Sequence, residues 1–317
     1  MPQLRLSTQL IVDEANRRNW PVDIIDASQS FVRIHPHGTE PVLLKSVISH
    51  KSNALAAQIA DFKNITAYLA SENGIATPHT EEVVSLPQAI SFLNKHTKVV
   101  VKPLAAAHSN GVTIDITGGE QLRAALLHAQ PYSKTTLIQQ QVDGMDIRLL
   151  FIGKQFAAAA IRESASVTGD GRSTIRELID AENRRPERGE NYQTALNIIP
   201  ASKVESFLGA RVDQVPNPGE MVKVVGPANI GAGGVSTDIT EEVDQTLVDL
   251  GRKVCEITGL AIGGVDFIMP DPRAPVSQAN PAYLIEVNSA PTLGLHERPH
   301  FGKSRAVSRL FLDWLTE

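Results

Sequence analysis

Hydrophobic spacing in the first part of the chain indicates a small α/β unit. Leu10, Ile11 and Ala15 lie at helical spacing, and Ser7 or Thr8 is the expected N-cap of that helix. Two short runs rich in β-forming residues come next, followed by an alanine-rich stretch with helical character; these segments are 22–25, 31–34 and 51–60.

The following part of the chain alternates helix and strand signals. Ile65, Leu69 and Ala70 mark a helix that is expected to stop at Asn73-Gly74, where glycine permits a left-handed C-cap. Further along, three apolar runs predict strands and one leucine-spaced stretch predicts a helix; the strands are 99–101, 112–116 and 136–140, and the helix is 120–130.

The last part of the chain opens with a predicted hairpin, because the strand runs 147–152 and 155–161 flank Gly153-Lys154. Beyond it we expect helices and strands separated by polar loops; the helices are 174–183 and 241–259, the strands 262–268 and 283–287, and the loops 183–193 and 270–281. A closing helix should pack onto the body through one apolar face, formed by Val307, Leu310, Phe311, Trp314 and Leu315.

These patterns divide the chain into three units, 1–60, 61–141 and 142–317. Composition adds that the protein is an ordinary globular chain, with 42% hydrophobic and 21% charged residues among 317. A net charge of −5 gives no support for a nucleic-acid partner. One cysteine, Cys255, excludes an intramolecular disulfide framework. No apolar run reaches the length of about 18 residues that a membrane span needs, so we expect a cytoplasmic protein with no membrane partner.

Three segments match known functional motifs in their letters, but the surrounding residues argue against each function. The sequence from His296 to His300 spells HExxH, but Pro299 removes a hydrogen bond from the helical turn that a zinc site of this type requires. Gly302-Lys303-Ser304 lacks the earlier glycine and the strand of a P-loop. The glycines at 231–234 are not followed by an evident helix, so a dinucleotide-binding loop is a weak interpretation.

A candidate metal site lies on the last two predicted strands. Glu286 and Asn288 point to the same face because side chains alternate along a strand, and Asp266 lies on the strand that precedes them. If the two strands pair, two carboxylates and one amide oxygen converge, which suits the hard cation Mg²⁺. The alternative is three unrelated polar residues on the solvated face of a sheet.

Candidate anion-binding residues lie on the neighbouring segments. Lys102 ends an apolar strand and can meet a phosphate as a point charge, although by itself it is more often an ordinary strand-end lysine. Arg148 lies on the first strand of the predicted hairpin and Arg162 directly follows the second, and guanidinium groups suit phosphates and carboxylates. Asn229 precedes the glycines at 231–234, which form a flexible loop able to close over a substrate.

Seven ordered segments of this sequence together resemble the ATP-grasp superfamily. The closest likeness is to the ATP-grasp domain of cyanophycin synthetases, and next to that half of bifunctional glutathione synthetases. The likeness runs from about Ser28 to Arg305. It is carried by VVVKPLAAAHSNGVTIDI, VDGMDIRLLFIG, IRESASVTGDGRSTIRELI, NRRPERGENYQTALNII, GPANIGAGGVSTDIT, GGVDFIMPD and LIEVNSAPTLGLHERP.

The resemblance implies an α+β fold of the ATP-grasp type. Two α+β subdomains would grip ATP, a lid at 61–141 and a catalytic subdomain at 142–317, with a short α/β unit at 1–60 before them. It also implies an ATP-dependent ligase that forms an amide or peptide bond between a carboxylate and an amine through an acyl phosphate, releasing ADP and phosphate. The alternative is a catalytically decayed regulatory protein that keeps the fold and binds ATP.

The resemblance also assigns roles to individual residues. Nucleotide contacts would come from Lys63 and Lys102 at the phosphates, from the linker that grips adenine largely through its backbone, and from Arg148, His108 and Gly111; the linker residues are Gln139, Gln140, Gln141 and Val142. Arg162 would stabilise the transferred phosphoryl group, with Lys102 and Asn229 also at the reacting groups. Asp266, Glu286 and Asn288 would hold Mg²⁺, with two ions expected and Mn²⁺ as a substitute.

Two departures from the family pattern qualify these roles. The linker usually contains an acidic residue, whereas three glutamines stand here; the loop after Lys102-Pro103 is filled mostly by alanine, although His108 and Gly111 fit. The second catalytic domains of both relatives have no counterpart in this sequence, so we expect one ligation.

The substrates would be small molecules, an amino acid or short peptide as donor and an amine as acceptor. Arg298, Lys303 and Arg305 could hold an acidic substrate, or form a solvated basic turn. Neither His108 nor His296 is a convincing general base. Related enzymes are often dimers or tetramers, so a homo-oligomer is one expectation, but no apolar stripe in the sequence indicates an interface.

Overall fold

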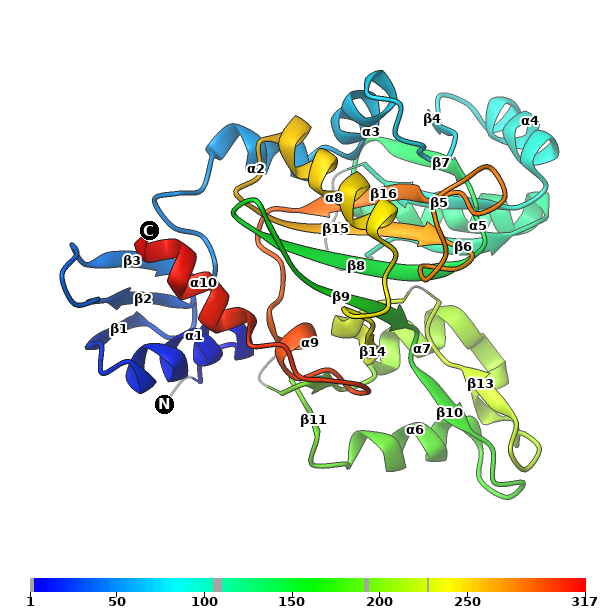
Figure 1. Cartoon of the computed structure of the whole chain (residues 1–317). Coiled ribbons are helices and arrows are strands. Elements are labelled where there is room, and N and C mark those ends of the chain that lie inside the picture. The colour runs from blue at the N-terminus through cyan, green and yellow to red at the C-terminus, as the bar shows by residue number, and fades with distance from the viewer. Residues whose placement is uncertain (1–2, 105–109, 191–193, 227) are drawn as a thin grey trace.

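The computed structural model describes residues 3–104, 110–190, 194–226 and 228–317. Figure 1 shows a small N-terminal unit at one end, two sheet-containing lobes side by side, and a helical and loop-rich insert below them. The mixture of helices and antiparallel sheets confirms the predicted α+β class.

The N-terminal unit consists of one helix and a three-stranded antiparallel sheet in the order β1-β2-β3; its elements are α1 (Leu6–Arg17), β1 (Val22–Asp26), β2 (Phe31–Ile34) and β3 (Val42–Lys45). The predicted cap is wrong, because α1 begins one turn earlier with Arg5 as N-cap, and Ser7 and Thr8 lie buried inside the helix. The Ser7 hydroxyl instead accepts a hydrogen bond from the backbone N–H of Leu293, which fixes α1 to the loop after the last strand.

The closing helix α10 (Val307–Thr316) packs on α1 and on one face of the large sheet, as predicted. Its buried face contains Val307, Phe311, Leu312 and Leu315. Leu310, predicted to be part of that face, is 39% exposed. The two ends of the chain are therefore joined in one hydrophobic core (Figure 1).

The second lobe is a four-stranded antiparallel sheet in the order β4-β7-β5-β6, with two helices packed on it. Its elements are β4 (Thr80–Glu82), α4 (Leu86–His96), β5 (Val99–Pro103), β6 (Thr113–Ile116), α5 (Gly119–Ala129), a 3-10 turn at Gln130–Tyr132 and β7 (Thr136–Gln140). The predicted strands and α5 are confirmed, whereas α4 and β4 were not predicted.

Two helices that precede this lobe pack elsewhere. Helices α2 (Ala54–Asp61) and α3 (Lys63–Glu72) contribute Ala56, Ala60 and Ala70 to the core of the large sheet. The predicted boundary at residue 61 falls on the last residue of α2, and it stays a prediction.

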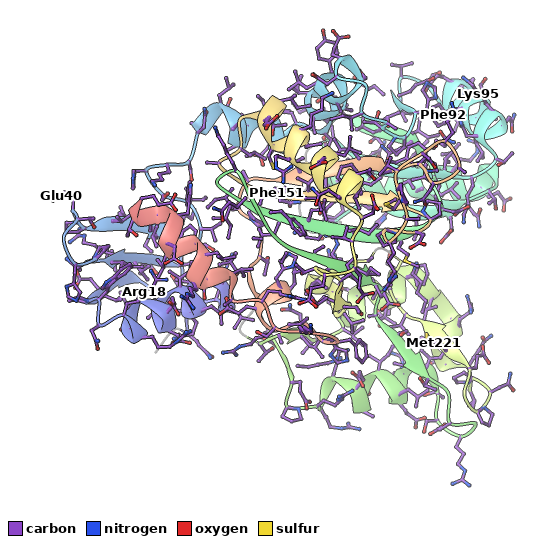
Figure 2. All side chains as sticks on the ribbon, viewed as in Figure 1. Arg18, Glu40, Phe92, Lys95, Phe151 and Met221 are labelled. Atoms are coloured by element: carbon purple, nitrogen blue, oxygen red, sulfur yellow. The ribbon has the colours of Figure 1, made fainter. Side chains whose placement is uncertain are left out.

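The large sheet carries five antiparallel strands in the order β14-β9-β8-β15-β16. Its strands are β8 (Met145–Ile152), β9 (Gln155–Glu163), β14 (Val235–Asp238), β15 (Ile262–Met269) and β16 (Tyr283–Asn288). Helix α8 (Gln245–Thr258) covers one face, starting four residues later than predicted. Gly251 lets α8 approach this face, where Phe151 is labelled in Figure 2.

An insert of about 70 residues separates the neighbouring strands β9 and β14 and has its own hydrophobic core. It contains β10 (Ser166–Thr168), α6 (Ile175–Asn183), β11 (Arg188–Gly189), β12 (Leu196–Asn197), α7 (Ala201–Leu208), 3-10 turns at Gly209–Asp213 and Ile230–Ala232, and β13 (Met221–Lys223). Only α6 was predicted. The exposed Met221, labelled in Figure 2, lies at the start of β13, which pairs with β10.

Among the described residues, no helix is long enough and apolar enough to span a membrane. The short helix α9 (Gly294–Glu297) ends before Pro299, so His296 and His300 do not share a helical turn, as the sequence analysis predicts.

Candidate active site

A cleft with a volume of about 2090 Å³ lies between the two sheets, the insert and the N-terminal unit. Most of the predicted site residues line it, although they come from segments far apart in the sequence. These residues are Lys63, Lys102, Gln139, Gln140, Gln141, Val142, Arg148, Arg162, Asn229, Asp266, Glu286 and Asn288.

Two of the predicted residues do not belong to this group. Gly111 is buried with a φ of +70°, and a Cβ there would come within 2.8 Å of Pro103, so its conformation and packing both require glycine. Its predicted role at the nucleotide is not tested by this position. His108 lies outside the described residues.

The candidate metal ligands are brought together by strand register. Asp266 on β15 is paired with Glu286 on β16, and Gly264 is paired with Asn288, so the three polar side chains share one face. Asn288 donates a weak hydrogen bond of 3.5 Å from Nδ2 to the carbonyl of Gly264. The strand-alternation argument thus predicts the arrangement correctly.

Two arginines hold Asp266 from the neighbouring strands. Arg148 on β8 is paired in register with Asp266 and donates from Nε to Oδ1 and, over 2.7 Å, from Nη2 to Oδ2. Arg162 on β9 donates from Nη2 to the same Oδ2 over 2.8 Å, and its Nε donates to Asp146 over 2.8 Å. The result is a buried network of two carboxylates and two guanidinium groups.

The network sets the charge of both carboxylates. Burial alone would raise the pKa of Asp266, but Arg148 and Arg162 hold that pKa below its ordinary value, so this carboxylate is ionised. Burial raises the pKa of Asp146 to about 6, against the opposing charge of Arg162. Asp146 was not singled out from the sequence, although its position two residues before Arg148 on a strand places both on one face.

Gly264 is a second residue that sequence reasoning missed. A Cβ at this position would lie 3.2 Å from Cδ of Arg148 and 2.8 Å from Pro291. The glycine therefore leaves the room in which the Arg148 side chain lies across β15 to reach Asp266. A glycine inside a strand is the available signal for such a close approach.

The donor set fits Mg²⁺. All three candidate ligands offer oxygen, and Oδ1 of Asp266, which accepts one hydrogen bond from Arg148, keeps a further lone pair, whereas Oδ2 accepts from both arginines. The described residues contain no group of three His, Cys, Asp or Glu side chains that could hold a metal by themselves. A cation here would therefore depend on the Asn288 amide and on oxygens from a ligand, as is common for Mg²⁺ with a nucleotide.

The two candidate phosphate lysines reach the same region from different elements, Lys63 from helix α3 beside the large sheet and Lys102 from the four-stranded sheet. Lys63, at the start of α3, lies 3.7 Å from Glu286, and Lys102 on β5 donates to Oε1 of Gln139 over 2.9 Å. Burial lowers the pKa of Lys102 to about 8; the charge of Lys63 acts in the same direction and Glu286 opposes it.

The linker glutamines have separate structural partners. The side chain of Gln141 accepts from the backbone N–H of Asp115 over 2.7 Å and donates to its carboxylate over 2.8 Å. Asp115 has a φ of +61°, which is unusual for a residue with a side chain, and Lys98 pairs with it at 2.8 Å. The linker is therefore fixed to β6 through Gln141, while Gln140 and Val142 also line the cleft.

The glycine-rich loop is tied to the insert by an arginine that the sequence did not reveal. Arg188 is buried and donates to the carbonyl of Gly233 over 3.1 Å and of Asn197 over 2.6 Å, while pairing with Glu182. Asn229 caps the short turn of this loop by accepting from the N–H of Gly231 over 2.8 Å. Position 188 lies in a polar segment with no periodic signal, so only tertiary structure identifies it.

The remaining sequence candidates are engaged elsewhere. Arg305 pairs with Asp238 at 2.5 Å, and Lys303 pairs with Glu241 at 2.5 Å, so these cations belong to a structural network. His296 is 1% exposed and burial lowers its pKa to about 3, which makes it a poor general base.

Solved structures with the same architecture show that the fold is of the ATP-grasp type. A bifunctional glutathione synthetase from Pasteurella multocida superimposes with a TM-score of 0.70 and 25% identity, covering 98% of this chain and 43% of that one. A D-alanine–D-alanine ligase from Bacillus anthracis superimposes with a TM-score of 0.52 and 15% identity, covering 84% and 69%. The predicted ATP-grasp fold is confirmed.

In sequence, the chain is a relative of cyanophycin synthetases and of bifunctional glutathione biosynthesis proteins. The cyanophycin synthetase of Crocosphaera subtropica is 31% identical over 98% of this chain and 36% of its own length. The glutathione biosynthesis bifunctional protein of Enterococcus faecalis is 28% identical over 99% of this chain and 42% of its own. The chain thus spans well under half of these relatives, and no family model matches it.

Proposed function

We propose that the chain is an ATP-dependent carboxylate–amine ligase that acts on an amino acid or short peptide through an acyl phosphate. The observation that carries the proposal is the register of β8, β15 and β16, which places Arg148, Asp266 and Glu286 in one row across the sheet. Lys63 and Lys102 line the same cleft, and Lys63 lies 3.7 Å from Glu286. The relatives named synthetases support the same class of reaction.

The geometry suits a reaction between two anions. Attack of a carboxylate on the γ-phosphate of ATP is opposed by charge, and Lys102 and Arg162 would reduce that repulsion. Mg²⁺ held by Asp266, Glu286 and Asn288, with two ions expected, would supply further charge neutralisation at the phosphates. Asp146 and Asp266 fix the Arg162 guanidinium, so its orientation is set before the substrates bind.

The product of the first step must be protected from water. An acyl phosphate is consumed when the amine attacks its carbonyl carbon, the C–N bond forms, and phosphate leaves with the oxygen that bridged it to the acyl group. The loop at 229–234, held through Arg188, lines the cleft with its first three residues and leads into β14, where Ser236 is paired with Arg162. Exclusion of water there would favour the amine over hydrolysis.

An ADP-release assay with ATP and Mg²⁺ tests the proposal. Single amino acids and short acidic peptides as donors are crossed with amino acids as acceptors, and each hit is examined by mass spectrometry. We expect a signal that depends on both substrates, with a product heavier by one condensed amine. ATP binding without turnover for every pair would favour a regulatory ATP-binding protein, for which the engagement of both Asp266 oxygens by arginines is the supporting observation.

Glu286→Gln is the cleaner variant for the metal assignment. Asp266→Asn also removes the partner of two buried arginines, whereas the Glu286 side chain is 34% exposed and pairs with Lys63. We expect turnover to fall about 100-fold or more with an unchanged melting temperature. Glu72→Gln, an exposed position on α3, serves as the matched control. Near-wild-type turnover of Glu286→Gln at saturating Mg²⁺ would show that Glu286 is not a metal ligand.

A further inference from the structure

A chain of three hydrogen bonds with a fixed direction lies behind Lys102. The Lys102 ammonium donates to Oε1 of Gln139 over 2.9 Å, and Nε2 of Gln139 donates to Oγ1 of Thr80 over 2.7 Å. The Thr80 hydroxyl donates to the carbonyl of Pro78 over 2.9 Å. An ammonium can only donate hydrogen bonds and a carbonyl can only accept them, so the two ends determine the direction of every bond in the chain. The amide oxygen of Gln139 must therefore face the lysine.

Because both side chains are buried, the contact between Lys102 and Gln139 affects the charge that the lysine presents to the cleft. Lys102 is 6% exposed and Gln139 is 8% exposed, so neither side chain is well solvated. The charged groups that act on Lys102 are Lys63 from α3 and Glu286 from β16. A carboxylate at position 139 would neutralise the ammonium at hydrogen-bond distance, whereas the amide accepts its hydrogen bond and adds no charge.

We propose that Gln139, held by Thr80, is a positioning residue that aims the Lys102 ammonium into the cleft and leaves its full positive charge for a nucleotide phosphate. The inference rests on the proposed function only in that the ligand is a nucleotide. It assigns to the Gln139 side chain a role at the phosphates, although the residue lies in the linker expected to contact the base through its backbone.

Calorimetry with MgATP, and ligand-detected NMR with adenosine as the phosphate-free probe, test the assignment. Gln139→Glu keeps the shape of the side chain and adds a negative charge. We expect MgATP affinity to fall about tenfold, because the ammonium is partly neutralised, while adenosine affinity changes less than about twofold. Gln155→Glu, at an exposed position of the β8–β9 hairpin, makes the same charge change away from the cleft and should leave both affinities unchanged.

Variants of Thr80 separate positioning from packing. Thr80→Val removes the hydroxyl that orients the amide and should weaken MgATP binding by about threefold to tenfold; Thr80→Ser keeps the hydroxyl and should restore it. Equal losses for both Thr80 variants, or unchanged MgATP affinity in Gln139→Glu, would overturn the inference while the nucleotide site stands. A wild-type chain that binds neither MgATP nor adenosine would overturn the proposed function as well.

Discussion

The Lys102 ammonium is a buried cation whose charge changes within the pH range of an ordinary assay. Burial lowers its pKa to about 8, from about 10.4 for a solvated lysine. The side chain is therefore mostly charged at neutral pH and mostly neutral above pH 9, where it would offer a phosphate only a hydrogen bond.

This charge change predicts an alkaline limit to nucleotide binding. A lowered lysine pKa means that the cation is lost as pH rises through about 8, so MgATP affinity should fall from pH 7 to pH 9. Isothermal titration at several pH values measures it. The arginine of Lys102→Arg stays charged over this range, so the MgATP affinity of this variant should be the same at pH 7 and pH 9, even where it differs from that of the wild type. A wild-type affinity that is equally flat would contradict the expectation.

At the residue scale, the sequence predicts the face shared by the candidate metal ligands better than the network of arginines and carboxylates around it. Period-two alternation is a local rule, so Glu286 and Asn288 can be assigned to one face from the sequence alone. The contact of Arg148 with Asp266 depends on the register between strands that lie 118 residues apart. The role of Gln139 depends on Thr80, which lies 59 residues away and carries no motif.

Among the elements, the hairpin between β8 and β9 depends on a single glycine. Gly153 has a φ of +62°, and a Cβ there would lie 2.7 Å from the ring of Trp314 on α10. Gly153→Ala should destabilise the protein by about 2 to 3 kcal/mol, from backbone strain and from the clash. Gly38 has a φ of +80° and open space around it, so Gly38→Ala introduces backbone strain without a clash and should lower the free energy of unfolding by about 1 kcal/mol. Urea denaturation measures both; equal losses would exclude the Trp314 contact.

Helix α6 is fixed at its start by a capping box. The Thr174 side chain accepts from the N–H of Glu177 over 3.2 Å, and the Glu177 carboxylate accepts from the N–H of Thr174 over 2.8 Å. Thr174→Ala should destabilise the insert by about 1 kcal/mol, and Thr174→Ser should not. Hydrogen exchange of the α6 amides measures the local opening, and identical exchange in all three proteins would argue against the cap.

The elements that escaped prediction do so for two different reasons. Helix α4 begins with Ser85 as N-cap and a proline in its first turn, so its sequence carries a start signal that the strand-rich surroundings obscured. The strands β10 and β13 are three residues long and pair with each other across the insert. Strands this short contain too few residues for alternation to be recognised.

At the scale of the whole molecule, α10 closes the core that α1 and the large sheet share. Phe311 is fully buried in this core, while its neighbour Leu310 is 39% exposed. Phe311→Ala should destabilise the chain by about 3 to 5 kcal/mol, whereas Leu310→Ala should cost less than about 1 kcal/mol. Denaturant unfolding followed by tryptophan fluorescence measures both. Similar losses for the pair would contradict the observed face of the helix.

The order of units along the chain was predicted from hydrophobic patterns, and the fold from ordered motifs. The packing between units was not, because Ala56, Ala60 and Ala70 show no sign in the sequence of which sheet they will cover. The predicted unit 142–317 does not distinguish the insert, because the separate core of the insert is formed by residues that are distant in sequence, such as Val167, Leu208 and Val224.

The strand on each side of the insert pairs with the other at its boundary, where Val235 is opposite Glu163. The chain thus leaves the sheet and returns to it at adjacent points, so the intervening segment can change in length or sequence without shifting a single rung of the ladder. This segment can therefore be replaced as a unit in evolution, together with Arg188 and Asn229 that lie within it, while Arg148, Arg162 and Asp266 of the sheet stay in place. A protein built this way can vary part of the lining of its cleft more readily than the charged groups of its sheet.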